Sequence, residues 1–102
     1  MQHKWNLEDD LVAVCMIKNG KNCLKYQYET TCSILDVQPN SMNMRLKNVE
    51  FVATDGKSGL SNAGKLTIYV WNNYKDMSDE AFIDLCNMIL DLKKQIKGIV
   101  EV

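Results

Sequence analysis

The stretch QPNSMNMRLKNV, residues 38–49, decides the fold that we predict, because it reads as a turn followed by a short amphipathic helix. Pro39 suits a turn or the first helical position, where its missing N–H removes no hydrogen bond. Asn40 or Ser41 can then cap the free amides of the first turn. Apolar side chains recur at helical spacing, so one side of this helix is expected to face the core. The residues on that side are Met42, Leu46 and Val49.

The opposite side of this predicted helix is polar and combines two kinds of DNA-binding side chain. Lysine and arginine bind phosphates, whereas amides can bond base edges in the major groove. We therefore predict a helix from Ser41 to about Val52 that lies in the major groove, with later lysines holding the DNA backbone. Asn43, Lys47 and Asn48 are expected at base edges. The full set of predicted DNA-binding residues is Asn40, Ser41, Asn43, Arg45, Lys47, Asn48, Lys57 and Lys65.

Two helices are predicted upstream of this stretch. Asn6 can cap a first helix whose acidic first turn complements the helix dipole, and Asn19-Gly20 is a helix stop. A second periodic stretch covers residues 28–35, and residues 36–39 follow as a turn. Two short helices joined by such a turn indicate a helix-turn-helix arrangement.

Two more helices are predicted downstream. Residues 54–64 are rich in turn-forming residues and read as a loop, after which a helix is expected from about Asn62 to Tyr74. Ser78 can cap the last helix, with Met77 placed to pack on Phe82 as a hydrophobic staple.

The last helix carries an apolar row at alternating spacings of three and four residues, which is the pattern of a coiled-coil seam. Two interpretations remain open: the row covers the core, or it joins two copies of the chain. Ile83, Cys86 and Leu90 widen the apolar surface, so the helix can contact the domain and a second subunit at once. The predicted dimerisation residues are Phe82, Leu85, Ile89, Leu92 and Ile96.

Length and composition predict one small all-α domain. With 102 residues and 46% hydrophobic content, the chain can bury one core. We expect about five helices, with a helix-turn-helix (Myb-like) domain over residues 1–76 and a packing or dimerisation helix over residues 77–102. No apolar stretch approaches the ~20 residues of a membrane span, and no signal peptide is visible, so we expect a cytoplasmic protein without membrane contact.

The sequence does not predict an enzyme. His3 is the single histidine, so neither a Ser/His/Asp set nor a Cys/His set can be assembled away from the terminus. The four cysteines form no CxxC pair, and we predict no metal, no cofactor and no catalytic residue. Buried free thiols are expected at Cys15, Cys32 and Cys86, with Cys23 exposed enough to react.

Charge argues both for and against double-stranded DNA as the partner. The net charge is −1, whereas most duplex binders are basic. However, residues 18–65 hold seven basic and four acidic side chains, a net +3 around the predicted reading helix. We therefore expect weak, salt-sensitive DNA contact that benefits from a dimer. The alternative is a protein-interaction module, an adaptor or inhibitor, that uses the helix-turn-helix surface or the last helix.

Two segments resemble known families. Residues 5–10, WNLEDD, resemble the opening of Myb/SANT-like domains, and residues 39–48, 59–66 and 70–71 resemble the small N-terminal domain found ahead of some bacterial HNH endonucleases. The resemblance implies a DNA-recognition or target-sensing module without the nuclease part. Two origins stay open: a domain that stands alone, as in a phage or mobile element, or one that has lost the catalytic part of its relatives. An HNH site needs several histidines, which this chain lacks. The family's turn reads leucine, glycine, arginine, a small polar residue and proline, whereas here it is LDVQP, residues 35–39.

Overall fold

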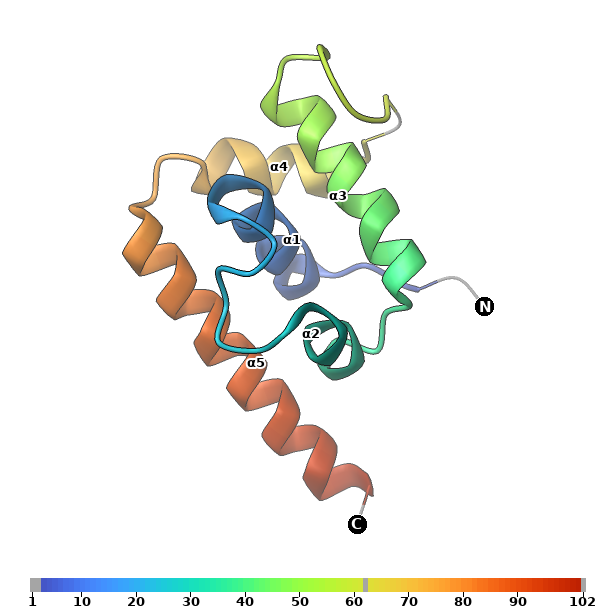
Figure 1. Cartoon of the computed structure of the whole chain (residues 1–102), viewed down its shortest axis with the longest axis vertical. Helices are drawn as coiled ribbons and strands as arrows, with labels where there is room; N and C mark the ends of the chain where they lie inside the picture. The colour runs from blue at the N-terminus through green and yellow to red at the C-terminus, as the bar shows by residue number, and fades with distance from the viewer. Residues whose placement is uncertain (1–2, 62, 102) are drawn as a thin grey trace.

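The computed structural model describes residues 3–61 and 63–101, with side chains up to residue 98. This part of the chain folds into five α-helices joined by turns and loops, which confirms the predicted all-α class (Figure 1). None of its helices is long and apolar enough to cross a membrane. The helices are α1 (Leu7–Asn19), α2 (Tyr28–Ile34), α3 (Pro39–Ala53), α4 (Lys65–Tyr74) and α5 (Asp79–Glu101).

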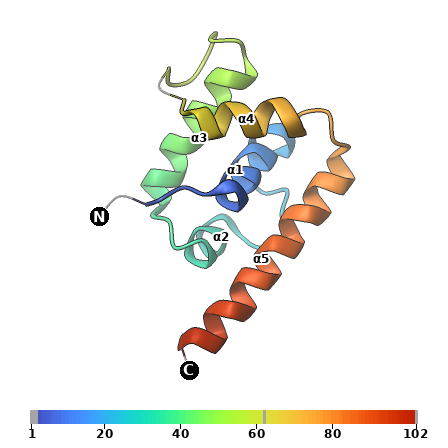
Figure 2. The same cartoon turned by 180° about the vertical axis from the view of Figure 1, so that it is seen from behind.

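Helix α1 lies inside the molecule, and α3, α4 and α5 all pack against it (Figures 1 and 2). A helix surrounded by others must be largely buried, and residues 9–16 of α1 are buried without a break. The side chain of Asn6 accepts a hydrogen bond of 2.9 Å from the amide of Asp9. At the other end, the amide of Gly20 donates to the carbonyl of Met16 at 2.8 Å. Both predicted ends of this helix are confirmed.

The turn between α2 and α3 owes its shape to Asp36, which has a φ of 57°. This is the left-handed conformation that glycine usually supplies and that aspartate tolerates better than most residues. The amide of Val37 closes the turn by donating to the carbonyl of Cys32 at 2.9 Å. Asp36 therefore supplies the left-handed residue that this turn needs.

Helix α3 begins at Pro39, with Gln38 at the N-cap and no side-chain capping bond. Of the two places predicted for Pro39, the first helical position is therefore confirmed, whereas the start at Ser41 and the cap from Asn40 or Ser41 are wrong. Proline at the first helical position needs no partner for an N–H, so the helix begins two residues earlier without a polar cap. The predicted inward side is confirmed, since Met42, Leu46 and Val49 are buried.

The loop after α3, predicted as a loop from its composition, folds back onto the helix that precedes it. The amide of Leu60 donates to the carbonyl of Lys47 at 3.1 Å. Gly59 has a φ of +94°, and a Cβ there would lie 2.3 Å from that carbonyl oxygen and 2.8 Å from the backbone nitrogen of Phe51. Only glycine permits this approach. The loop therefore covers the C-terminal part of α3.

Helix α4 begins at Lys65; the predicted start at Asn62 lies outside the described residues. Helix α5 begins as predicted, because the amide of Ala81 donates to the Ser78 hydroxyl at 3.3 Å. Buried side chains anchor α5 to the core, and its C-terminal turns extend past α2 (Figure 2). The fully buried residues of α5 are Phe82, Cys86 and Leu90.

Candidate nucleic-acid interface

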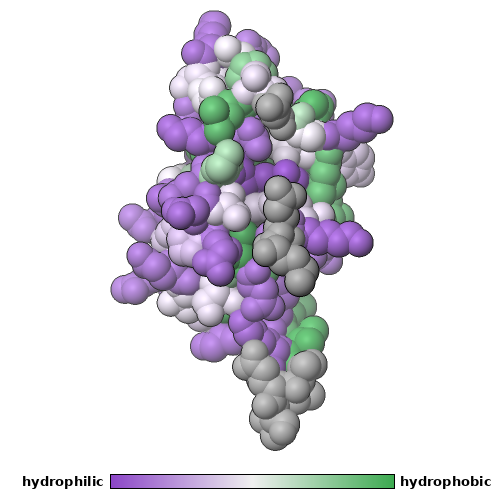
Figure 3. Space-filling model, turned by 90° about the vertical axis from the view of Figure 1, so that its right-hand side faces the viewer, coloured by the Kyte–Doolittle hydropathy of each residue, from purple (hydrophilic) through white to green (hydrophobic). Residues whose placement is uncertain are grey.

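The outer face of α3 is open along its first turns. Asn40, Asn43, Met44 and Lys47 are all exposed there, and Met44 keeps 60% of its surface accessible. Their spacing of three and four residues places them on one side of the helix. Figure 3 shows the side of the molecule that carries α3, and hydrophilic residues dominate it. Three of the predicted DNA-binding residues, Asn40, Asn43 and Lys47, are thus brought together.

Asn43 is held by two neighbours from the segment before α2 and from α2 itself. Its Oδ1 accepts a hydrogen bond from the Tyr28 hydroxyl at 2.6 Å and another from Lys21 Nζ at 3.2 Å. Lys21 Nζ also lies 4.0 Å from the centre of the Tyr28 ring, a cation–π contact. Because the amide oxygen is occupied, the two N–H donors of Nδ2 are the part of Asn43 that can meet a ligand.

Lys21 extends the basic surface, although it is not among the DNA-binding residues predicted from the sequence. It lines a shallow hollow of about 500 Å³ between α1 and α3, together with Asn43, Lys47 and Glu50. The position of a lysine in a polar loop cannot be predicted from sequence spacing. Lys21 lies next to Asn43 only because α1 packs beside α3. The carboxylate of Glu50 accepts a hydrogen bond from the Ser58 hydroxyl, which ties it to the folded-back loop.

Arg45, the single arginine, is directed away from this face. Its Nε and Nη2 donate to Oδ1 and Oδ2 of Asp10, both at 2.6 Å. Thr67 donates to the same carboxylate at 3.3 Å, and the guanidinium lies 4.6 Å from the centre of the Trp5 ring. The side chain of Asp10 is fully buried and that of Arg45 is 14% exposed. This pair joins α1 to α3, so we leave Arg45 out of the interface that we propose.

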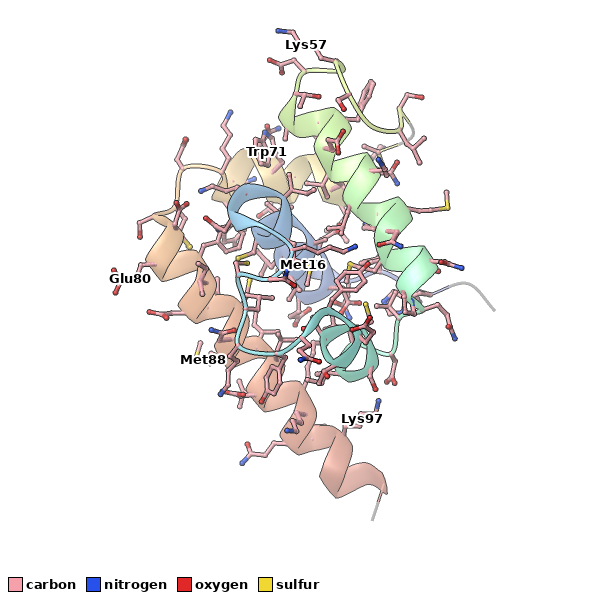
Figure 4. The ribbon with its side chains drawn as sticks, in the orientation of Figure 1. Met16, Lys57, Trp71, Glu80, Met88 and Lys97 are labelled. Carbon is pink, nitrogen blue, oxygen red and sulfur yellow. The ribbon has the colours of Figure 1, made fainter. Side chains whose placement is uncertain are left out.

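The remaining predicted DNA-binding residues lie at different places. Ser41 and Asn48 are half-buried on α3. Lys57 lies at the tip of the loop beyond α3, where its side chain points into solvent (Figure 4). Lys65 is exposed as the first residue of α4. The structure therefore separates both later lysines from the open turns of α3.

A second polar cluster joins the N-terminal segment to α5. Nε2 of His3 lies 2.7 Å from Oδ2 of Asp9, and Nζ of Lys93 lies 3.9 Å from Oδ1. The Asp9 side chain is only 2% exposed, and this burial raises the pKa of its carboxyl group. The cluster borders a hollow of about 510 Å³ between α1, α2 and α5.

All four cysteines are free thiols. Cys15, Cys32 and Cys86 are buried, as predicted. Cys23 is half-buried and is therefore the most accessible of the four, with its Sγ 4.0 Å from that of Cys15. Burial raises the pKa of Cys23 to about 12, which disfavours its thiolate. Within the described residues, no group of three potential ligands is placed to hold a metal ion.

Comparisons of the chain with protein-family models, with curated proteins and with solved structures found no match.

Proposed function

We propose that this protein binds double-stranded DNA without catalysing a reaction, through the open first turns of α3. The observation that carries the proposal is the exposed polar face of Asn40, Asn43 and Lys47, with Lys21 beside it. The turn at Asp36 between two consecutive helices, α2 and α3, also supports a helix-turn-helix as the binding unit.

The chemistry of this face fits DNA in two ways. Lys21 and Lys47 supply positive charge for phosphates, which gives most of the affinity of a DNA-binding protein. The Nδ2 donors of Asn43 suit acceptor atoms on base edges in the major groove. The hydrogen bonds from Tyr28 and Lys21 fix the orientation of the Asn43 amide before DNA arrives, which lowers the entropy cost of binding.

The number of lysines bounds the affinity. If Lys21 and Lys47 each meet one phosphate, the slope of log K against log salt is about −1.8. Glu50 borders the same hollow as these lysines and opposes the attraction. We therefore propose weak binding by one copy of the chain, lost readily as salt is added.

The test is fluorescence anisotropy of a labelled random duplex at two salt concentrations, with Lys47→Ala and Lys75→Ala compared with the unmodified protein. Lys75 is exposed at the far end of α4, so its loss changes the net charge equally at another place. We expect Lys47→Ala to weaken binding and to reduce the salt slope by about 1, with Lys75→Ala close to the unmodified protein. No binding at low salt, or equal effects of the two variants, would contradict the proposal.

A second variant tests the base-edge role of Asn43. Asn43→Ala should lower the preference for a selected sequence over random DNA more than it lowers binding to random DNA, because phosphate contacts carry no sequence information. Circular dichroism of the same samples checks that the loss of the Tyr28 bond leaves the helices intact.

The second candidate function is a protein-interaction module. The observation that favours it is the set of exposed apolar side chains on α5, among them Met88, Leu92 and Ile96. Exposed apolar patches of this kind mark sites of protein–protein interaction in many proteins. If none of the DNA-binding experiments above shows binding, the protein-interaction module becomes the favoured function.

A further inference from the structure

Helix α5 carries an apolar row that its own domain covers only in part. Met88, Leu92 and Ile96 are 54%, 52% and 59% exposed, and Leu85 and Ile89 are half-buried beside them. In Figure 4 the side chain of Met88 points away from the body of the molecule. We call these five residues the α5 stripe.

The stripe is distinct from the surface by which α5 joins the core. Residues two apart on a helix point in nearly opposite directions, because each residue turns the helix by about 100°. Met88 follows buried Cys86 by two residues, and Leu92 follows buried Leu90 in the same way. Met88 and Leu92 therefore point away from the core. Ile89, which packs partly against the core, and Ile96, which borders the hollow between α1, α2 and α5, form the edge of the stripe nearer the domain.

The spacing of the stripe matches what a second helix needs. Leu85, Ile89, Leu92 and Ile96 follow one another at four, three and four residues, the heptad spacing at which two helices interlock their side chains. Such a seam is self-complementary, so an identical helix can pack against it. A closed two-fold pair is also the commonest form of homo-oligomer.

Charge selects the relative direction of the two helices. The first turns of α5 carry exposed Glu80 and Asp84, whereas exposed Lys94 lies toward the other end of the helix. The remaining charges of these two ends, Asp79, Lys93 and Lys97, form ion pairs within the chain. A parallel pair would place acidic ends together and basic ends together. An antiparallel pair places each acidic end beside the basic end of its partner and also opposes the two helix dipoles.

We infer that the α5 stripe is a docking surface for a second copy of this chain, paired antiparallel along α5. The contact does not involve the open face of α3 and does not depend on DNA. A stripe of about three helical turns is smaller than the ~800 Å² per partner of a standard interface, so we expect a dissociation constant in the micromolar range or above.

Sedimentation equilibrium over a wide concentration range tests the surface, with a matched pair of variants. Met88→Glu and Met44→Glu make the same change at similarly exposed methionines, one on the stripe and one on α3. We expect the chain to dimerise as its concentration rises, and Met88→Glu to raise the dissociation constant at least about tenfold, since a carboxylate would lose water in the contact. Met44→Glu should leave dimerisation unchanged.

Two results would overturn this inference. A chain that stays monomeric at every concentration would assign the stripe to a different partner. A dimer that Met88→Glu does not weaken would place the contact elsewhere. Because Met44→Glu adds a negative charge to the proposed DNA face, it should weaken DNA binding without affecting the dimer, so the two proposals fail separately.

Disulfide cross-linking tests the direction. In an antiparallel pair centred on the stripe, position 85 of one copy lies beside position 96 of the other. The variants Leu85→Cys and Ile96→Cys should therefore cross-link under a mild oxidant when mixed, and much less when each is alone. Efficient cross-linking of each variant to itself would show a parallel pair and refute the antiparallel arrangement.

Discussion

The buried pair of Asp10 and Arg45 gives the sharpest prediction about stability. Replacing Arg45 with methionine leaves the carboxylate of Asp10 with no counter-charge, and that side chain is fully buried. Breaking a buried ion pair from one side costs about 3–5 kcal/mol. Because Asp10 cannot reach water, we expect Arg45→Met near the upper end of that range.

The reverse change should cost less. Asp10→Asn keeps an oxygen for Thr67 but strands the guanidinium, which is 14% exposed and also rests on Trp5. Partial access to water lets Arg45 recover some hydration. We therefore expect Asp10→Asn to lower the free energy of unfolding by about 3 kcal/mol, the lower end of the range. In a domain of this size that corresponds to a fall in melting temperature of ~12–24 °C.

The double variant makes the reasoning refutable. Asp10→Asn combined with Arg45→Met removes both charges, so it should be less destabilised than the Arg45→Met variant alone. Urea unfolding followed by the fluorescence of the two tryptophans measures all three variants, and Asp91→Asn, which breaks an exposed pair with Lys25, serves as a control with a far smaller effect. Additive effects, or single variants that each cost less than about 1 kcal/mol, would show that the pair is not the structural link we describe.

Two further predictions concern the loop after α3 and the cluster around Asp9. Gly20→Ala meets no atom within 4 Å and should cost only the ~1–3 kcal/mol of a backbone conformation that other residues rarely adopt, whereas Gly59→Ala also places a Cβ 2.3 Å from the carbonyl of Lys47. Urea unfolding should therefore show a clearly larger loss for Gly59→Ala; equal losses would mean that the loop does not press on α3. For Asp9, the raised pKa means that the folded state holds the proton more tightly than the unfolded state. Its contribution to stability is greatest below the ordinary value of 3.8 and is lost as pH rises through the raised pKa. The stability of the unmodified protein relative to Asp9→Asn should thus fall as pH rises across that window, and a constant difference between the two urea midpoints would contradict it.

Features that depend on neighbours in the chain could be predicted from the sequence. The Asn6 cap, the stop at Gly20 and the Ser78 cap each involve groups within about four residues. The buried side of α3 follows in the same way from helical spacing. The turn over residues 36–39 was predicted, but its left-handed residue was not, because Asp36 occupies a conformation that glycine usually supplies.

The role of Arg45 could not be predicted, because its partner lies 35 residues earlier in the chain. A charged residue beside Asn43 and Lys47 reads as part of a solvated or DNA-binding face. Asp10 reads as a residue that complements the dipole of its own helix. Only the packing of α1 against α3 joins the two side chains and buries the carboxylate.

The apolar row of α5 was predicted, but the sequence could not say which part of it faces the core. Phe82 begins the row and is fully buried, whereas Leu92 and Ile96 remain more than half exposed. Cys86 and Leu90, which were predicted to widen the apolar surface, are fully buried and make the contact with the domain. Helical spacing fits both the buried and the exposed apolar residues of α5, so only the packing of α5 against its neighbours decides which of them face the core.

If α3 binds DNA as we propose, the loop that folds back onto this helix also limits how it can meet the duplex. Contact between Gly59 and the carbonyl of Lys47 obstructs the later turns, so the segment from Pro39 to Lys47 is left to enter a groove. Nine residues of helix are roughly 13 Å long, which spans about four base pairs. The helix would therefore approach the duplex with its amino-terminal end first, and one copy would read a very short site. Discrimination between genomic sites would then require two copies of the helix bound to one stretch of DNA.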